Sequence, residues 1–226
     1  SLVHPHAQTP AAESYRIIRT SLMSRPESLP YRVLVTSPGE NEGKTTLSVN
    51  LAMAMAQLED TKVVLVDADF RNQTNHPIYD VGTKSSSPLG LVQFLRGEAL
   101  LSEVVHKAFF PNLSVIPSGG RPNNPTELLY SGALTQLLNW SLENRYHLIF
   151  DCPPVLPIAD AAVLAPRVDG VLMVVSAGET TREACRLAIQ RMTFSGGKVL
   201  GIVMQKARMT DSPYFYNYYG SHQGQT

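Results

Sequence analysis

A short stretch near the start of the chain, residues 33–46, restricts the possible folds more than any other. It begins with the apolar run Val33-Leu-Val and passes through a loop to Gly43-Lys44-Thr45, where a helical pattern over Leu47–Gln57 starts. In a loop between a buried strand and a helix, backbone N–H groups and the positive end of the helix dipole bind phosphate. The lysine reaches the β- and γ-phosphates, and the threonine hydroxyl is a ligand for Mg²⁺. The stretch therefore predicts a nucleoside-triphosphate site, with ATP and Mg²⁺ as the expected ligands.

The loop differs in one place from the strict pattern G-x-x-x-x-G-K-[ST]. Pro38 stands where that pattern has glycine, and Gly39 follows one residue later. The alternative is a turn that contains Gly-Lys-Thr without binding phosphate, but strand, loop and helix all fall where phosphate binding needs them. We expect the nucleotide to be bound by Gly39, Glu40, Asn41, Glu42, Gly43, Lys44, Thr45 and Thr46.

Two further apolar stretches end in carboxylates. Residues 63–71 read Val-Val-Leu-Val-Asp-Ala-Asp-Phe-Arg, and residues 147–154 read His-Leu-Ile-Phe-Asp-Cys-Pro-Pro. In open α/β sheets, ligands bind at the carboxyl ends of the strands. Asp67, Asp69 and Asp151 should therefore meet beside the phosphates.

The residue types at this edge of the sheet indicate separate catalytic roles. Phosphoryl transfer depends mainly on positioning and on neutralising charge. Lys44 is expected to contact the phosphates, Thr45 to bind Mg²⁺ with Asp69 and Asp151 nearby, and Asp67 to act as the base. Arg71 either stabilises charge on the transferred phosphate or forms an ion pair with Asp69, and the sequence leaves both roles open.

Strand-like and helix-like segments alternate along the rest of the chain. This alternation predicts an α/β fold in which a mostly parallel β-sheet is flanked by helices on both faces. Later strands are expected at 113–116, 147–151, 169–176 and 199–204, and helices at 89–94, 100–105, 126–144, 158–165 and 180–192. The polar stretch 72–88 is expected to be a loop bordering the site.

Composition argues against several functional classes. The 226 residues fit one α/β domain, and 19 basic residues balance 19 acidic ones, so no nucleic-acid partner is expected. Cys152 and Cys185 lack metal-ligand spacing and are expected to be free thiols in a reducing compartment. No apolar run is long enough to span a membrane, and no signal peptide is seen. Because the chain begins at Ser1, the sequence leaves open whether a membrane segment lies upstream.

The two ends of the chain differ from its centre. Residues 1–10 have the composition of an irregular arm, and residues 11–23 have helical spacing that places Glu13, Arg16 and Arg19 on one face. Near the other end, a tyrosine cluster follows the last expected strand: Tyr214, Tyr216, Tyr218 and Tyr219. The cluster is either an extended phosphate acceptor or an edge strand or interface patch.

Taken in order, these motifs resemble those of the bacterial tyrosine kinases that control capsule and exopolysaccharide export. The matching stretches are 37–45, 65–71, 148–154 and the C-terminal tyrosines, and residues 13–19 are similar to the family's E-x-x-R-x-x-R motif. The resemblance covers nearly the whole chain. It implies a P-loop NTPase fold related to that of partitioning ATPases, and ATP-dependent autophosphorylation of the tyrosine cluster in trans. It also implies an N-terminal arm and oligomerisation helix at 1–30, a kinase domain at 31–206 and a flexible tail at 207–226.

Partners and a location are implied in the same way. Glu13, Arg16 and Arg19 are expected to mediate assembly of a homo-oligomeric ring. The domain is expected to attach to a membrane polysaccharide co-polymerase, fused or separate, and thus to act in the cytoplasm at the inner face of the plasma membrane. An opposing tyrosine phosphatase is also implied.

Two positions depart from the family's pattern. Asn41 stands where many relatives have glycine, so the backbone there is less free to adopt positive φ and activity is expected to be modest. Gln205 stands where relatives commonly have asparagine, at a position associated with the adenine base. The base preference is therefore open, with ATP as the expected nucleotide.

Two other functions use the same motifs. A partitioning-type or cell-division-site ATPase normally carries an extra lysine shortly before the Gly-Lys pair, and the segment 38–42 contains none. A catalytically inactive module would bind nucleotide only to assemble rings. Phosphotyrosine and released phosphate, measured after incubation with Mg·ATP, would separate these two functions from a tyrosine kinase.

Overall fold

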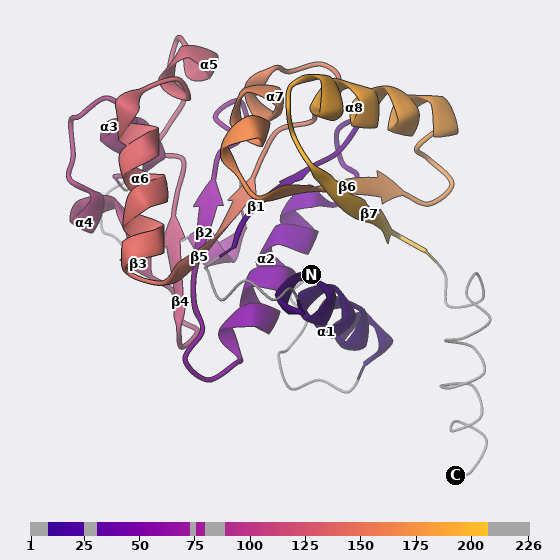
Figure 1. Cartoon of the computed structure of the whole chain (residues 1–226), viewed down its shortest axis with the longest axis horizontal. Coiled ribbons are helices and arrows are strands. Elements are labelled where there is room, and N and C mark those ends of the chain that lie inside the picture. Colours follow the sequence, from indigo (N-terminus) through magenta and orange to yellow (C-terminus); the bar gives the residue numbers. More distant parts are fainter. Residues whose placement is uncertain (1–8, 25–30, 73–75, 80–88, 208–226) are drawn as a thin grey trace.

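The computed structural model describes residues 9–24, 31–72, 76–79 and 89–207. Its centre is a seven-stranded sheet in the order β3-β4-β2-β5-β1-β6-β7 (Figure 1). Neighbouring strands run parallel, except that β3 pairs with β4 in the antiparallel direction. The strands are β1 (Arg32–Thr36), β2 (Lys62–Asp67), β3 (His106–Lys107), β4 (Leu113–Ile116), β5 (Tyr146–Asp151), β6 (Gly170–Ser176) and β7 (Val199–Gln205). The predicted mostly parallel sheet is confirmed.

The central strands are apolar along most of their length because both faces of the sheet are covered. Every residue of β1 after Arg32 is buried, and β6 is buried at every position. Strands that are buried on both faces show continuous apolar runs and not an alternating pattern. This burial explains why β1, β2, β5 and β6 were readily recognised in the sequence.

Helices cover the two faces of the sheet (Figure 1). On one face, α1 (Pro10–Met23), α2 (Lys44–Ala56) and the short 3₁₀ turn η1 (Pro77–Tyr79) share a hydrophobic cluster with residues of the sheet. The second cluster, on the other face, involves α3 (Leu91–Leu95), α4 (Leu101–Val104), α5 (Pro125–Leu128), α6 (Gly132–Glu143), α7 (Asp160–Leu164), η2 (Ala165–Arg167) and α8 (Arg182–Phe194).

Helix α1 packs directly on α2. It begins after Thr9, whose hydroxyl accepts a hydrogen bond from the N–H of Ala12, and it buries Tyr15 and Leu22. The guanidinium of Arg19 donates to the carbonyl oxygen of Ala54, 3.0 Å away on α2. The helix predicted over 11–23 is confirmed, and most of the predicted arm lies outside the described residues.

The secondary structure differs from the prediction in three places. The helix expected over 126–144 is two helices, α5 and α6, because the backbone of Ser131 is extended, with φ −62° and ψ 152°, and α6 begins anew after it. The strand β3 was missed because it has only two residues, which are too few to show a period. Part of the stretch expected to be a loop, 72–88, forms η1, and residues 73–75 and 80–88 lie outside the described part of the chain.

Within the described residues, no helix has both the length and the apolar character needed to cross a membrane. Cys152 is buried and Cys185 is partly exposed, and both are free thiols, as the sequence predicted.

Candidate active site

The phosphate loop connects the end of β1 to the start of α2. Asn41 adopts a φ of 58°, in the left-handed region that asparagine tolerates better than most residues. Gly43 has a φ of 94°, and a Cβ atom at this position would lie 3.1 Å from Cγ of Gln205. Glycine is therefore needed at position 43 both for the backbone conformation and for the close approach of Gln205.

A cavity of about 510 Å³ opens in front of this loop. It is lined by Glu40, Asn41, Gly43, Lys44, Thr45, Thr46, Asp69, Asn72 and His76. The first N–H groups of α2 have no partner within the helix, and they lie at the positive end of its dipole. The cavity therefore combines the elements needed to bind phosphate: a helix amino terminus, the ammonium group of Lys44 and the hydroxyl of Thr45.

Two residues that were predicted to contact the nucleotide form a hydrogen bond with each other and do not line the cavity. The N–H of Gly39 donates to Oε2 of Glu42 over 2.9 Å, and the other carboxylate oxygen of Glu42 accepts from the hydroxyl of Thr180 over 2.5 Å. Glu42 is buried, with 7% of its surface exposed. Its carboxylate thus links Gly39 of the loop to Thr180 and does not face the cavity.

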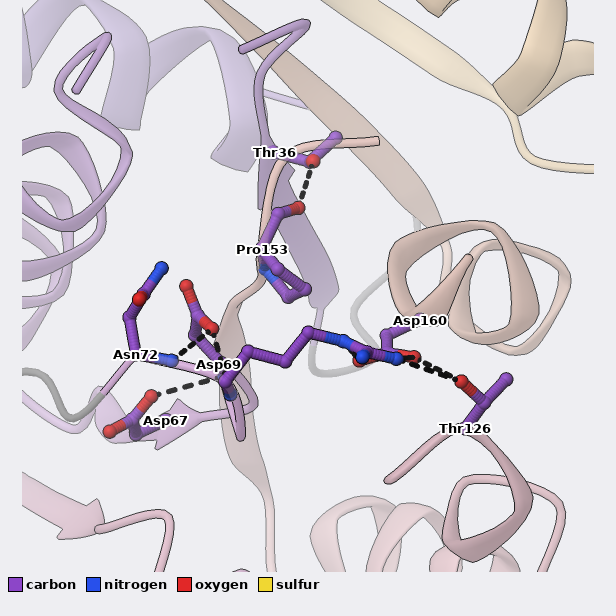
Figure 2. Close-up of polar contacts among 8 residues, drawn as sticks. Thr36, Asp67, Asp69, Asn72, Thr126, Pro153 and Asp160 are labelled. Atoms are coloured by element: carbon purple, nitrogen blue, oxygen red, sulfur yellow. Dashed lines mark hydrogen bonds and ion pairs between the residues drawn. The ribbon is translucent and has the colours of Figure 1, made fainter. Parts of the chain in front are cut away.

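The carboxylates of β2 and β5 meet at the carboxyl edge of the sheet, as expected. Asp67 and Asp151 are register partners in the parallel pair, and the N–H of Ala68 donates to the carbonyl oxygen of Asp151 over 2.9 Å. Oδ1 of Asp67 accepts from the N–H of Asp69 over 3.1 Å, while Oδ1 of Asp69 accepts from the N–H groups of Arg71 and Asn72 (Figure 2). Asp69 lines the cavity, whereas Asp67, two residues earlier, is buried and is not among the lining residues.

Asp151 is a buried carboxyl group with an unusual pKa. Burial raises this pKa to about 6, although hydrogen bonds from Thr45 and Ser48 and the charge of Lys44 oppose the shift. The hydroxyl of Ser48 on α2 donates to Oδ1 over 3.2 Å. Oδ2 is buried and has no hydrogen-bond partner among the described residues. An unpaired buried oxygen next to Thr45 is the arrangement that a bound cation would complete.

The guanidinium group of Arg71 contacts Asp160 and not Asp67 or Asp69. Its Nε lies 3.3 Å from Oδ2 of Asp160 at the start of α7, and the hydroxyl of Thr126 donates to the other oxygen of Asp160 over 2.5 Å (Figure 2). The carboxylate of Asp160 is almost fully buried. The alternative in which the Arg71 guanidinium pairs with Asp69 is therefore wrong: the contact between the two residues is made by the backbone N–H of Arg71, and the guanidinium contacts Asp160.

The sequence did not predict several residues at the site. Asn72 and His76 line the cavity, Ser48 contacts Asp151, and Asp160 holds Arg71. Nδ1 of His76 accepts from the N–H of Ile78 over 3.3 Å, and burial lowers the pKa of His76. Asn72 and His76 fall in a polar stretch without periodicity, so no sequence signal distinguished them.

The remaining predicted residues fall into three groups. Gln205 packs on Gly43 beside the loop, and its side chain forms a hydrogen bond with Tyr15 of α1. On α1, Arg16 forms an ion pair with Glu13 over 3.0 Å within the helix, and Arg19 bonds to α2. The four tail tyrosines lie outside the described residues.

The parallel sheet and the loop at the amino end of α2 define the class of protein: a P-loop NTPase domain. The model of the AAA domain family matches residues 40–193. The septum site-determining protein MinD of Pyrococcus horikoshii, complexed with Mg-ADP, has the same fold, with a TM-score of 0.60 and 20% identity over 76% of this chain and 69% of that chain.

More similar proteins identify the family. The tyrosine-protein kinase YwqD of Bacillus subtilis is 33% identical over 93% of this chain and 86% of its own length. The chimerical protein CapA2B2 superimposes with a TM-score of 0.80 and 30% identity, covering 89% of this chain and 87% of that chain. The kinase domain of the Escherichia coli tyrosine kinase ETK also gives a TM-score of 0.80, with 31% identity over 91% of this chain and 80% of that domain. The chain belongs to the family of bacterial tyrosine-protein kinases, and the resemblance inferred from its motifs is confirmed.

Relatives of the chain differ greatly in length. The match to YwqD spans 86% of that protein. In contrast, the tyrosine-protein kinase etk of Escherichia coli is 34% identical over 86% of this chain, but the match spans only 26% of the relative. The same domain thus occurs as most of one protein and as a minor part of another.

Proposed function

We propose that the domain transfers the γ-phosphoryl group of ATP to tyrosine, and that its main acceptors are Tyr214, Tyr216, Tyr218 and Tyr219 on a neighbouring copy of the chain. One observation carries this proposal. A single cavity joins Lys44 and Thr45 of the phosphate loop to Asp69 at the carboxyl edge of the sheet. A nucleotide bound by the loop would therefore present its last phosphate to Asp69 and to the carboxylates at the ends of β2 and β5.

The residues of the loop would bind and neutralise the phosphates. Lys44 is almost fully buried, so its ammonium group acts in a region of reduced dielectric constant, where a charge interaction is stronger than in water. The N–H groups of the first turn of α2 supply fixed donors that need no rearrangement during transfer. These two features stabilise negative charge as it moves between the phosphates.

The donor set at the edge of the sheet fits Mg²⁺. A hydroxyl and carboxylates are the ligands this cation prefers, and Thr45, Asp69 and Asp151 would hold it together with phosphate oxygens. The unpaired buried Oδ2 of Asp151 supports this assignment. Bound Mg²⁺ would neutralise charge on the phosphate oxygens.

We assign Asp67 as the base that orients the acceptor hydroxyl and takes its proton. A free tyrosine hydroxyl has a pKa of about 10, so a carboxylate must accept the proton as the new bond forms. One oxygen of Asp67 is occupied by the N–H of Asp69, which fixes the orientation of the carboxylate. We expect Asp67→Asn to slow transfer more than it weakens binding of Mg·ATP, whereas Asp69→Asn should affect both.

The first experiment replaces Lys44 with methionine and measures phosphotyrosine after incubation with Mg·ATP. Loss of phosphotyrosine with an unchanged unfolding curve is expected, because the lysine acts as a charge on the phosphates. Lys198→Met is the matched control, since Lys198 is exposed and distant in sequence from the motifs. Phosphotyrosine at the wild-type level in Lys44→Met would refute the site.

A nucleotide-dependent assembly switch is the second candidate function. The fold is shared with MinD complexed with Mg-ADP, and this likeness supports nucleotide binding without requiring phosphoryl transfer to tyrosine. The same incubation separates the two functions. Release of phosphate without phosphotyrosine, detected by antibody, would favour the switch. If neither phosphate nor phosphotyrosine is formed while Mg·ADP still binds, a purely structural role is favoured.

Partners and location follow from the proposed kinase activity. We propose assembly into a ring through α1 and attachment to a membrane polysaccharide co-polymerase at the inner face of the plasma membrane, opposed by a tyrosine phosphatase. The two lengths of the relatives support a partner that is fused in some proteins and separate in others. Co-purification of the chain with membranes in the presence and absence of the co-polymerase tests the attachment.

A further inference from the structure

The turn between β6 and α8, residues 176–180, contacts the phosphate loop through one side chain. The hydroxyl oxygen of Thr180 accepts a hydrogen bond from the N–H of Ser176 over 2.8 Å. The single hydrogen of this hydroxyl is donated to Oε1 of Glu42 over 2.5 Å. Both hydrogen-bonding functions of Thr180 are thus used, and they join two parts of the chain that are 138 residues apart.

Glu42 connects this turn to the start of the loop. Its Oε2 accepts the N–H of Gly39, so the carboxylate bridges Gly39 and Thr180. The loop between Gly39 and Lys44 contains the left-handed residues Asn41 and Gly43. For a residue other than glycine, such as Asn41, this backbone conformation persists where surrounding contacts hold it. The bridge through Glu42 supplies such contacts, and it lies outside the cavity that would receive the phosphates.

The turn itself is anchored to the end of β7. The N–H of Ala177 donates to the carbonyl oxygen of Gln205 over 2.9 Å. The hydroxyl of Ser176 donates to Glu179, which also forms an ion pair with Lys206 over 2.7 Å. Thr180 therefore extends from a turn fixed at two further points, and it can hold Glu42 in place without moving with the loop.

We propose that Thr180 is a positioning residue for the phosphate loop, acting through Glu42 to hold the loop in the shape that presents Lys44 and Thr45 to a nucleotide. The inference rests on the proposed nucleotide site but adds a residue that no motif of the sequence contains. Without the hydroxyl, the buried carboxylate of Glu42 loses a donor, and the loop gains conformations in which its amide groups no longer converge. Affinity for nucleotide then falls because only a fraction of molecules has the competent loop.

The test compares Thr180→Val, Thr180→Ser and Thr181→Val. Valine keeps the shape of threonine without the hydroxyl, and serine restores the hydroxyl. Thr181 is the matched control because its hydroxyl caps α8 by accepting the N–H of Ala184. Binding of Mg·ADP is measured by calorimetry. We expect Thr180→Val to weaken binding about 10-fold or more, which corresponds to one lost hydrogen bond to a charged group, and Thr180→Ser to stay within about 3-fold of the wild type.

A second measurement does not depend on nucleotide. Hydrogen exchange at the N–H of Gly39 in the ligand-free protein should speed up in Thr180→Val and in Glu42→Gln, and should keep its wild-type rate in Thr181→Val. Unchanged exchange at Gly39 and unchanged Mg·ADP affinity in Thr180→Val would overturn the inference while leaving the proposed function intact. A wild-type protein that does not bind Mg·ADP would overturn the proposed function, and unchanged exchange at Gly39 would still decide against the positioning role. Equal losses of affinity in Thr180→Val and Thr181→Val would show a general effect of α8 and would also refute it.

Discussion

Replacing Asp151 with asparagine should stabilise the ligand-free protein while abolishing transfer. Burial raises the pKa of Asp151 from 3.8 to about 6. The folded state therefore binds a proton at this carboxyl group more tightly than the unfolded state does. The stability that comes from this difference is fully present below pH 3.8 and is lost as the pH rises through 6. Above that pH the protein bears the full cost of a buried carboxylate.

The magnitude follows from the size of the shift. A shift of roughly 2 pKa units corresponds to about 3 kcal/mol at pH 8, since each unit is worth about 1.4 kcal/mol, and to roughly half that at pH 5. Asparagine removes the charge and can keep an acceptor for the hydroxyl of Ser48. Its amide group would occupy the place of Oδ2, which has no partner among the described residues. The unfavourable burial of this amide reduces the gain to about 1–2 kcal/mol at pH 8.

Urea unfolding at pH 5 and pH 8 measures the effect, with the fluorescence of Trp140, the single tryptophan, as the signal. Asp60→Asn is the control, because Asp60 is exposed and its left-handed φ of 62° suits asparagine. The advantage of Asp151→Asn over the wild type should grow between pH 5 and pH 8, whereas that of Asp60→Asn should not. Phosphotyrosine formation should be lost, because the variant lacks the carboxylate that we propose as a ligand of Mg²⁺. A variant that is less stable than the wild type at both pH values would refute the reasoning.

Three further outcomes are expected. Replacing all four tail tyrosines with phenylalanine should remove nearly all phosphotyrosine without reducing ATP binding; if phosphotyrosine persists, mass spectrometry should find it first at Tyr130, which is 63% exposed, and not at the buried Tyr15, Tyr31 or Tyr79. Arg71→Met should lower the free energy of unfolding by about 1–3 kcal/mol because Asp160 stays buried without its cation, whereas Arg96→Met, in an exposed pair 3.8 Å apart, should change it by less than about 0.5 kcal/mol. Replacing both Glu13 and Arg16 with alanine should reduce the mass in solution, measured by light scattering, with little loss of stability. Arg19→Ala should lower stability because it removes the hydrogen bond to Ala54. An unchanged mass in the double variant would refute assembly through this face of α1.

The sequence predicted those parts of the site that are set by local order along the chain. The phosphate loop, the carboxylates after two strands and the parallel sheet all follow from patterns a few residues long, and β1, β2 and β5 bring them together. The partner of Arg71 could not be predicted in this way, because Asp160 is 89 residues away and is placed by the packing of α7. The bridge from Glu42 to Thr180 spans 138 residues and has no period or motif. Contacts of this kind depend on how helices and strands pack against each other, and no local pattern in a single sequence indicates them.

Tyr15 connects helix α1 to the nucleotide cavity through the side chain of Gln205. Its hydroxyl bonds to the side chains of Gln205 and Asn50, and Gln205 packs on Gly43 at the edge of the cavity. A neighbour that binds α1 and shifts it must therefore change the free energy of nucleotide binding if the shift alters the Tyr15–Gln205 contact. Thermodynamic reciprocity then requires the nucleotide to change the affinity of α1 for that neighbour by the same factor. The occupancy of the cavity by nucleotide and the size of the assembly then depend on the same coupling free energy. Titrating the protein with nucleotide, or varying its concentration to change assembly, would measure that free energy.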